Sequence, residues 1–531
     1  MDKEYDVIVV GAGSAGCAVA YRLAKESQLQ VLLLEAGSAD NSLLIHMPMG
    51  FAFLLKPHKN NWAYRTKPEK HLHNRVVELP RGKVLGGCSS INGMVYIRGQ
   101  KEDFDRWSAL GNEGWSYKEV LPYFTRSEHY ERGADTYHGS GGPLWVSDTI
   151  DEFPIHQAFI DAAAQAGHRF NSDVNGTSQD GVSWFPRTIK NGRRHSSARA
   201  FLGAGQSLNN LTVLTGAQVT RVIIENDRAV AVKVKMKEQQ FTVRARKEIV
   251  LSGGAINTPQ LLELSGVGQA DRLAGLGITV KKDLPGVGEN LQDHWNAYIK
   301  QSAVGVKTYY SEAKGIKLFK NICRYIFTKQ GFLGDSAATV AVFYKAVAYA
   351  TSPDAQIHFA PAASEVDVKG NLQPIEAVTL STCQLRPISR GAVHIASGDF
   401  RDAPDIRVNY LTALEDQQLA VAAFKKGREI IAQPSLRNML GSELAPGNEI
   451  NSDAQILDYI KRTGEPVHHL AGSCKMGNDS MAVVSQELRV YGIAGLRIAD
   501  ASIMPDLVSG NTHATCVMIA EKCADFILRE R

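Results

Sequence analysis

Two histidines near the end of the chain occupy positions suited to proton transfer. His469 lies in a turn-rich loop, and His513 opens a helical pattern just after a turn at Gly510 and Asn511. Imidazole exchanges protons near neutral pH. A helix that begins at His513 can also point its positive end at a ligand that gains negative charge. Most histidines are structural, so their positions make these two candidates for acid–base chemistry.

Residues near the N-terminus form a pattern that could hold a nucleotide. Gly11, Gly13 and Gly16 follow a short apolar run that begins at Tyr5, and a second apolar run ends at Glu35. In a βαβ unit these glycines permit a tight turn, close approach of a pyrophosphate and close helix–strand packing. Glu35 has the spacing of a carboxylate that accepts hydrogen bonds from an adenosine ribose. The pattern predicts dinucleotide binding, and the alternative is a glycine-rich turn that binds nothing.

Further elements must bring these distant residues together. Small residues at 86–93 would let backbone amides approach a flat ligand. Alternating apolar and polar residues at 211–251, separated by tight polar turns, predict a β-meander. A helix is expected to follow it, with Thr258 as N-cap and Pro259 in the first turn.

The middle of the chain, about 295–463, contains alternating runs typical of an antiparallel sheet with helices on one side. Residues 313–329 within it have an amphipathic helical pattern, which predicts a core-facing helix with a solvated basic face. Contact with an anionic membrane surface is the alternative. The apolar segment 43–55 is broken by Pro48 and Gly50, so we expect a buried loop or a lid over a pocket.

Composition argues against several classes of protein. A chain of 531 residues should form two to four folding units. The net charge is only +4 and there is no basic block, so nucleic acid is not an expected partner. Seven scattered cysteines without a CxxC pair predict neither disulfides nor a metal site, and reduced thiols fit a cytoplasmic protein. Because the first strand is predicted to begin at Tyr5, no signal peptide is expected, and no apolar run is long enough to predict a bilayer-spanning helix.

Four stretches resemble the signature sequences of the glucose-methanol-choline (GMC) oxidoreductases. They are GGCSSIN at 86–92, GAINTPQLLELSGVG at 254–268, HLAGSC at 469–474 and DASIMP at 500–505. The motifs run in family order from residue 5 to about 525, so the resemblance covers the whole chain. Segments 45–50, 61–64 and 94–99 are most similar to the choline-dehydrogenase-like and aliphatic alcohol dehydrogenase branch. The resemblance is specific for the family and much less so for the substrate.

The resemblance implies an α/β fold (α+β overall) with two domains. A Rossmann-like FAD-binding domain that includes the β-meander would be formed by residues 1–155, 190–295 and 465–531. A substrate-binding domain of antiparallel sheet and helices would be formed by residues 156–189 and 296–464.

The resemblance also implies roles for individual residues. His469 matches the family's catalytic base, which takes the hydroxyl proton while the carbinol carbon passes hydride to flavin N5 and an aldehyde forms. His513 matches a second position that hydrogen-bonds the substrate oxygen. The expected FAD contacts are Gly11, Gly13, Gly16 and Glu35 for the ADP half, Val219 for adenine, Gly87, Asn92 and Gly93 near the ring system, and Asp500 and Asn511 toward the pyrophosphate and ring.

Ile91 stands where some relatives attach FAD through a histidine, so non-covalent FAD is expected. The favoured reaction is oxidation of a primary alcohol, with electrons passed to a quinone or another carrier. An oxygen-using oxidase, a flavin-dependent lyase or photodecarboxylase, and a non-enzymatic nucleotide-binding protein are the alternatives. The apolar segment 43–55 favours an aliphatic or aromatic alcohol over a sugar. The oligomeric state is left open, as is peripheral contact with the inner membrane face.

Overall fold

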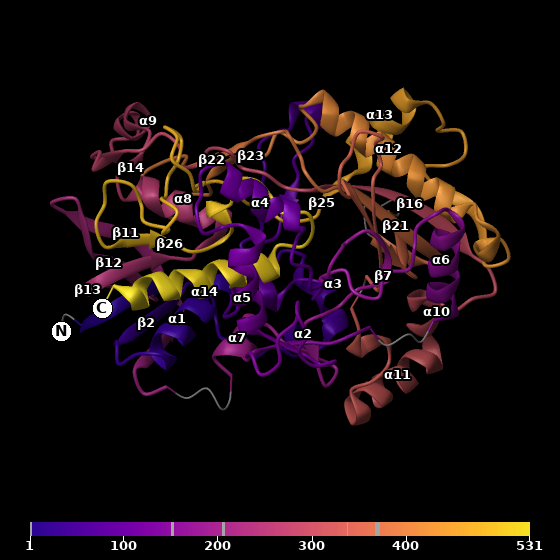
Figure 1. Ribbon diagram of the computed structural model, residues 1–531, viewed down its shortest axis with the longest axis horizontal. Coiled ribbons are helices and arrows are strands. Elements are labelled where there is room, and N and C mark those ends of the chain that lie inside the picture. Colours follow the sequence, from indigo (N-terminus) through magenta and orange to yellow (C-terminus); the bar gives the residue numbers. More distant parts are fainter. Residues whose placement is uncertain (1–2, 150–152, 204–207, 337, 367–371, 531) are drawn as a thin grey trace.

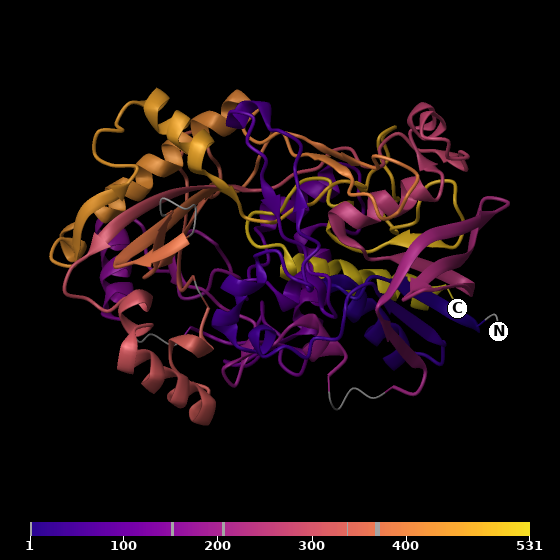
Figure 2. The same cartoon turned by 180° about the vertical axis from the view of Figure 1, so that it is seen from behind.

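The computed structural model describes residues 3–149, 153–203, 208–336, 338–366 and 372–530. It has two large sheets, each packed on its own hydrophobic core (Figures 1 and 2). Helices and strands are mixed throughout, which confirms the predicted α/β fold class. The bounds predicted for the two domains stay a prediction, because sheet membership alone does not define an independently folding unit.

The first sheet is built on the N-terminal βαβ unit. Strand β1 (Lys3–Val10), helix α1 (Ser14–Lys25) and strand β2 (Val31–Glu35) confirm the unit predicted from Tyr5 to Glu35. The apolar second half of β1 (Val7–Val10) lies parallel to β2 in the sheet interior, and every residue of β2 is buried. The C-terminal helix α14 (His513–Arg529) packs along α1 (Figure 1). The two ends of the chain therefore meet beside the glycine turn.

The β-meander is confirmed, with a change of strand order. Strands β11 (Ala217–Glu225), β12 (Arg228–Met236) and β13 (Gln239–Leu251) are antiparallel neighbours. Strand β10 (Leu211–Thr215), predicted as the first meander strand, instead pairs in parallel with β2. Gly216 has a φ of +68° and turns the chain out of this edge strand. The last two predicted runs form the single strand β13, which leaves the meander and also pairs in parallel with β1.

The predicted start of the next helix was wrong. Helix α8 spans Gly254–Leu264, so Thr258 is no N-cap and Pro259 lies inside the helix. A proline at this position lacks the N–H that would bond to the Ala255 carbonyl. The Ser473 hydroxyl donates to that carbonyl at 2.6 Å instead. A tertiary hydrogen bond thus replaces the one that proline removes.

The second sheet is antiparallel, as predicted, in the order β24-β16-β21-β18-β17-β7. Helices α6, α12 and α13 pack on it along the outer side of the molecule (Figure 1). Its strands are β7 (Gly181–Trp184), β16 (Trp295–Ala303), β17 (Val340–Tyr344), β18 (Ala355–Ala360), β21 (Ala377–Gln384) and β24 (Leu440–Ala445). The three helices on this sheet are α6 (Pro154–Gln165), α12 (Leu414–Ile431) and α13 (Asp453–Thr463), and α4 (Lys101–Ala109) and α5 (Tyr117–Ser127) precede them in the chain.

Two predictions about apolar segments were wrong in part. Residues 43–55 form short helical turns rather than a buried loop, and Leu43 and Phe53 are exposed, but Phe51 and Leu55 line a pocket, as the predicted alternative of a lid requires. Helix α11 (Gly315–Thr328) exists as predicted, but none of its residues is buried, so it does not face the core. Among the described residues, no helix is both long enough and apolar enough to cross a bilayer. All seven cysteines are free.

Candidate active site

One cavity of about 340 Å³ collects nearly all the residues singled out from the sequence. Its wall includes Gly11, Gly13, Glu35, Gly87, Asn92, Gly93, Val219, His469, Asp500, Asn511 and His513. Gly16 is absent from the wall because it supports the turn from behind. A Cβ on Gly16 would lie 1.8 Å from the carbonyl oxygen of Gly11. Segments from both ends of the chain therefore build a single site.

The glycine turn leaves a clear approach to the start of α1. Gly11 has a φ of +99°, and an added Cβ would lie 2.5 Å from the Ser252 carbonyl oxygen. At Gly13 the nearest atom to an added Cβ is 3.9 Å away, and no side chain caps the helix. The backbone N–H groups at the start of α1 are thus accessible to an anion. An added Cβ on Gly87 would lie 2.7 Å from Gly13 Cα, so the two glycine segments touch.

Glu35 is a buried carboxylate at the far side of this turn. Its Oε2 accepts a hydrogen bond from the Ala12 N–H at 2.9 Å, and its Oε1 accepts one from the Gly37 N–H at 2.7 Å. Burial raises the pKa of Glu35 to about 7, and the two N–H groups oppose that rise. Each carboxylate oxygen has a further lone pair that a ribose hydroxyl could use.

This raised pKa predicts a pH-dependent affinity for an adenine dinucleotide. Ribose hydroxyls donate to the ionised carboxylate, so protonation below about pH 7 should compete with binding. We expect affinity to fall by up to about tenfold per pH unit below that point and to level off above it. Reconstitution of cofactor-depleted protein between pH 5.5 and 8.5 measures this. Glu35→Gln should bind weakly at every pH, and an equally steep pH dependence in that variant would contradict the assignment.

Asp500 joins the starts of two helices at the cavity wall. Its Oδ2 accepts from the Gly254 N–H at 2.8 Å and from the Thr258 hydroxyl at 2.6 Å. Its Oδ1 accepts from the Ser502 N–H at 2.8 Å, which caps the short helix η6 (Ala501–Ile503). Its contact with a cofactor stays a prediction, because these bonds show only how it shapes the wall.

The hydrogen bonds of His469 fix which of its ring nitrogens is basic. His294 Nε2 lies 2.9 Å from the Leu385 carbonyl oxygen, which can only accept, so this nitrogen carries the proton. Burial lowers the pKa of His294 to about 4, which leaves its Nδ1 bare as an acceptor. His469 Nδ1 lies 2.9 Å from that atom and must donate to it. Burial and the neighbouring His294 hold the pKa of His469 well below its usual range, so the ring is neutral and its Nε2 carries no proton.

Asn511, rather than His513, contacts this basic nitrogen. Asn511 Nδ2 donates to His469 Nε2 at 3.1 Å. His513 Nδ1 lies 3.0 Å from the Ser14 hydroxyl, and burial followed by the charge of Arg194 lowers its pKa to about 4. His513 Nε2 and Asn511 Oδ1 are buried and have no partner within the described part of the chain. His513 Nε2 is available to a ligand, whereas the Asn511 side chain also contacts His358, where it opposes the burial that lowers the pKa of that histidine to about 4.

Two carboxylates hold the partners of His469 in place. Asp293 Oδ1 accepts from the backbone N–H of His469 at 2.6 Å and of His294 at 2.9 Å. This one oxygen therefore fixes the spacing between the two histidine backbones.

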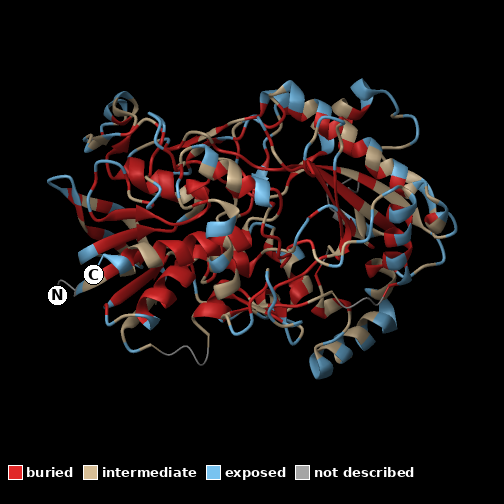
Figure 3. Ribbon diagram, viewed as in Figure 1, coloured by how far each residue is buried: buried red, intermediate tan, exposed pale blue. Residues whose placement is uncertain are grey.

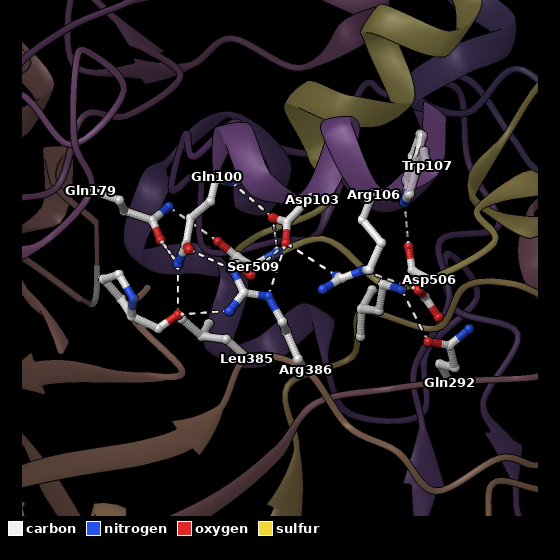
Figure 4. Close-up of polar contacts among 12 residues, drawn as sticks. Gln100, Asp103, Arg106, Trp107, Gln179, Gln292, Leu385, Arg386, Asp506 and Ser509 are labelled. Carbon is white, nitrogen blue, oxygen red and sulfur yellow. Dashed lines mark hydrogen bonds and ion pairs between the residues drawn. The ribbon is translucent and has the colours of Figure 1, made fainter. Parts of the chain in front are cut away.

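Asp103, on α4, binds the two segments that carry Asn511 and Leu385 (Figure 4). It accepts from the Ser509 N–H at 2.7 Å and hydroxyl at 2.8 Å, and from Arg386 Nε at 3.2 Å. Ser509 lies two residues before Asn511, and Arg386 follows Leu385, whose carbonyl orients His294. Asp103 thus connects the segment of Asn511, which contacts Nε2 of His469, to the segment of Leu385, which orients the partner of Nδ1.

Sequence reasoning missed His294 and Arg194. His294 ends the glycine-rich stretch 284–294, and that position was the only signal for it. The buried Arg194 guanidinium donates to Asn92 Oδ1 at 2.8 Å and to the Ile45 carbonyl at 2.8 Å. It forms no ion pair within the described residues, and burial lowers its pKa to about 9. Nothing in the local sequence distinguishes Arg194 from a surface arginine.

Comparison with known proteins identifies the family. The N-terminal part of the GMC oxidoreductase model matches residues 5–296, and the C-terminal part matches residues 387–520. The chain belongs to the GMC oxidoreductase family. An alcohol dehydrogenase (acceptor) of Pseudomonas putida is 42% identical over 99% of this chain and 96% of its own length. An oxygen-dependent choline dehydrogenase of Pectobacterium carotovorum is 41% identical over 99% of this chain and 95% of its own.

Solved structures share the fold over its whole length. A pyridoxine 4-oxidase from Mesorbium loti superposes with a TM-score of 0.89 at 31% identity, covering 99% of both chains. A formate oxidase of Aspergillus oryzae, studied for FAD modification, gives a TM-score of 0.93 at 25% identity, covering 100% of this chain and 99% of its own. This GMC oxidoreductase is therefore an enzyme with the FAD-binding Rossmann-like fold of a flavoprotein family.

The cavity fits FAD by its own features. The uncapped start of α1 offers N–H groups to a pyrophosphate, and Glu35 offers acceptors to a ribose. Gly93 has no atom within 4 Å of an added Cβ, which leaves room for a flat ring system beside it. Asn511 and His513, whose Oδ1 and Nε2 atoms have no hydrogen-bond partner within 3.5 Å among the described residues, line the same cavity. Polar and open positions thus occur where both halves of FAD would need them.

Proposed function

We propose that this GMC oxidoreductase oxidises a primary alcohol to an aldehyde and uses non-covalently held FAD. The observation that carries the proposal is the buried, unprotonated Nε2 of His469 at the cavity wall. A neutral imidazole with a fixed tautomer is suited to accept the proton of an alcohol hydroxyl. Bound FAD supplies the acceptor for the hydride that leaves the carbinol carbon.

The side chains of His469, Asn511 and His513 would each form a hydrogen bond with the hydroxyl group of the substrate. The alcohol donates its hydroxyl hydrogen bond to His469 Nε2, where Asn511 Nδ2 now donates at 3.1 Å. Asn511 then shifts its amide hydrogen to the oxygen that is losing its proton. When Ser14 donates to His513 Nδ1, the proton of His513 lies on Nε2 and can point at the same oxygen. Donors aimed at developing negative charge favour the transition state over the bound alcohol.

The acidic residues of the wall favour a neutral substrate. Glu35 and Asp500 are the only carboxylates among the described residues that line the cavity, and both already accept backbone N–H groups. A quaternary ammonium would find no uncommitted carboxylate there. Trp62 already stacks on Tyr64 and has Lys83 Nζ 4.2 Å from its ring centroid, so this ring is not free to form an aromatic cage with Phe51. Phe51, Trp62 and Met94 add apolar surface to the wall. We therefore assign an aliphatic or aromatic alcohol in preference to choline or a sugar.

An anaerobic screen of flavin bleaching tests this substrate class. Aliphatic and aromatic primary alcohols should bleach the flavin in the dark, while choline and glucose should do so at least about tenfold less efficiently. Choline as the best substrate would contradict the class. Acid precipitation of the protein should release the yellow FAD, because Ile91 at the cavity wall offers no nucleophile.

The electron acceptor is proposed to be a quinone or another carrier rather than oxygen. The support is the similarity to a P. putida alcohol dehydrogenase named for an unspecified acceptor, while other relatives are named as oxygen-dependent or as oxidases. Oxygen consumption and reduction of a soluble quinone should be measured with the same alcohol. Faster turnover with oxygen alone would make the enzyme an oxidase and leave the chemistry at His469 unchanged.

Replacing His294 should impair catalysis without loss of FAD. His294→Phe removes the acceptor that keeps the proton of His469 on Nδ1. One neutral hydrogen bond contributes about 0.5–1.5 kcal/mol, so flavin reduction should slow by about 2–10-fold. His294→Asn keeps an acceptor near the position of Nδ1 and should restore most of the rate. Equal rates for these two variants, with FAD content unchanged, would contradict the tautomer argument.

A further inference from the structure

Helix α11 presents an apolar surface that the rest of the described chain does not cover. Its exposed fractions are 67% for Ile316, 63% for Phe319, 55% for Ile326 and 84% for Phe327. These are large aliphatic and aromatic side chains on one short helix, and none of its residues is buried. Figure 3 shows α11 as an exposed element that stands at the edge of the molecule. Contiguous exposed apolar surface of this kind marks an interaction site.

The orientation of the helix is fixed by polar contacts on another face. Leu318, Asn321 and Tyr325 recur at helical spacing and, with Cys323, are its half-buried residues. Tyr325 donates its hydroxyl to the Gly192 carbonyl at 3.1 Å, and Asn321 donates to the Glu312 carbonyl at 3.1 Å. These contacts direct the apolar face away from the protein.

The charges beside that face select the partner. The helix carries Lys317, Lys320 and Arg324 and has no acidic residue of its own. Glu312, just before it, lies 3.4 Å from Lys317. Basic residues that border an exposed apolar face match the combination of anionic headgroups and acyl chains at a membrane surface. A second copy of the chain would instead bring two basic helices together.

We propose that α11 docks this enzyme on an anionic lipid surface, with its apolar face inserted into the headgroup–acyl boundary. The helix would lie in the plane of the interface, since 14 residues are too few to span a bilayer. Lys317 and Lys320, both exposed, would contact lipid phosphates. Each such contact strengthens binding to an anionic surface and weakens as salt screens it.

A chain of neighbouring segments connects the apolar face of α11 to the cavity. The 3-10 turn η4 (Phe332–Gly334) follows α11 and packs against η1 (Pro48–Gly50). Phe51, immediately after η1, lines the cavity, and the neighbouring Phe53 is 61% exposed. Docking would therefore bring the segment that borders the cavity close to the lipid phase. Delivery of an apolar alcohol or a membrane quinone along this route rests on the proposed function, whereas the lipid contact does not.

Vesicle co-sedimentation of the FAD-loaded enzyme tests the proposal. Wild type should sediment with vesicles of phosphatidylcholine and phosphatidylglycerol, and less with phosphatidylcholine alone or at high salt. The paired change Phe319→Ser and Phe327→Ser should lower partitioning by at least about tenfold. Lys317→Glu with Lys320→Glu should do the same for anionic vesicles.

Matched controls lie elsewhere on the surface. Leu414→Ser removes an apolar residue that is 62% exposed, and Lys233→Glu with Lys237→Glu reverses two exposed charges on and after β12. Both controls should sediment like wild type. All variants should reduce a soluble dye with alcohol at the wild-type rate in the absence of lipid, which separates this proposal from the proposed function.

Two results would overturn the proposal. One is wild-type protein that stays in the supernatant with anionic vesicles while still oxidising alcohol. The other is a lipid-free dimer that Phe319→Ser with Phe327→Ser converts to a monomer, because that would assign the face to a second copy of the chain.

Discussion

Flavin reduction by an alcohol should slow by about 10²–10⁴-fold in His469→Ala, with FAD still bound. The change removes His469 Nε2. The hydrogen bonds from Leu385 through His294 keep this nitrogen unprotonated at the cavity wall. Without it, the hydroxyl proton has no acceptor as hydride leaves. Anaerobic stopped-flow measurement of flavin absorbance gives the rate directly.

A control histidine makes this result specific. His71 is exposed and absent from the cavity wall, so His71→Ala should reduce its flavin at the wild-type rate. Reduction of the His469→Ala flavin at near wild-type speed would show that another group takes the proton. The structure leaves His513 as the first alternative, because its Nε2 would carry no proton if its Nδ1 donated to the Ser14 hydroxyl instead of accepting from it.

Gly13→Val should abolish FAD binding while leaving the protein folded. An added Cβ at Gly13 has no atom nearer than 3.9 Å, so the fold has room for it. The same Cβ points into the space beside the start of α1, where a pyrophosphate would lie. We expect FAD affinity to fall on the order of 100-fold or more. FAD content after purification and a thermal unfolding curve report binding and fold separately.

Substitutions at two other glycines serve as controls for Gly13→Val. Gly275→Val, at the exposed end of helix α9 (Ala270–Gly275), meets no atom within 4 Å and should retain FAD. Gly16→Val should damage the fold itself, because its Cβ would lie 1.8 Å from the Gly11 carbonyl oxygen. Full FAD retention by Gly13→Val would mean that the pyrophosphate does not approach α1 at this turn.

Features determined by neighbouring residues could be predicted well. The βαβ unit follows from apolar runs around Gly11 and Gly13, since periodicity and glycine position are properties of local sequence. The meander strands follow from the same kind of pattern. The amino-acid sequence alone therefore predicts the fold class and the family, together with the glycine and acidic residues that line one cavity.

Features that depend on distant partners could not be predicted. The contact between His294 and His469 joins residues 175 positions apart, and the tautomer depends on a third residue, Leu385. The predicted start of α8 failed because Ser473, far along the chain, satisfies the carbonyl that Pro259 leaves unpaired. Helix α11 shows the same limit, because an amphipathic pattern predicts an apolar face but not what covers it.

The most direct test of the central claim is anaerobic reduction of the wild-type flavin by a primary alcohol in the dark, with hydrogen or deuterium on the carbinol carbon. We predict that the flavin absorbance bleaches, that one aldehyde forms for each flavin reduced, and that the deuterated alcohol reacts more slowly because its C–H bond breaks in this step. A flavin that stays oxidised with every alcohol, or that bleaches only under illumination, would contradict the assignment of this site to alcohol oxidation.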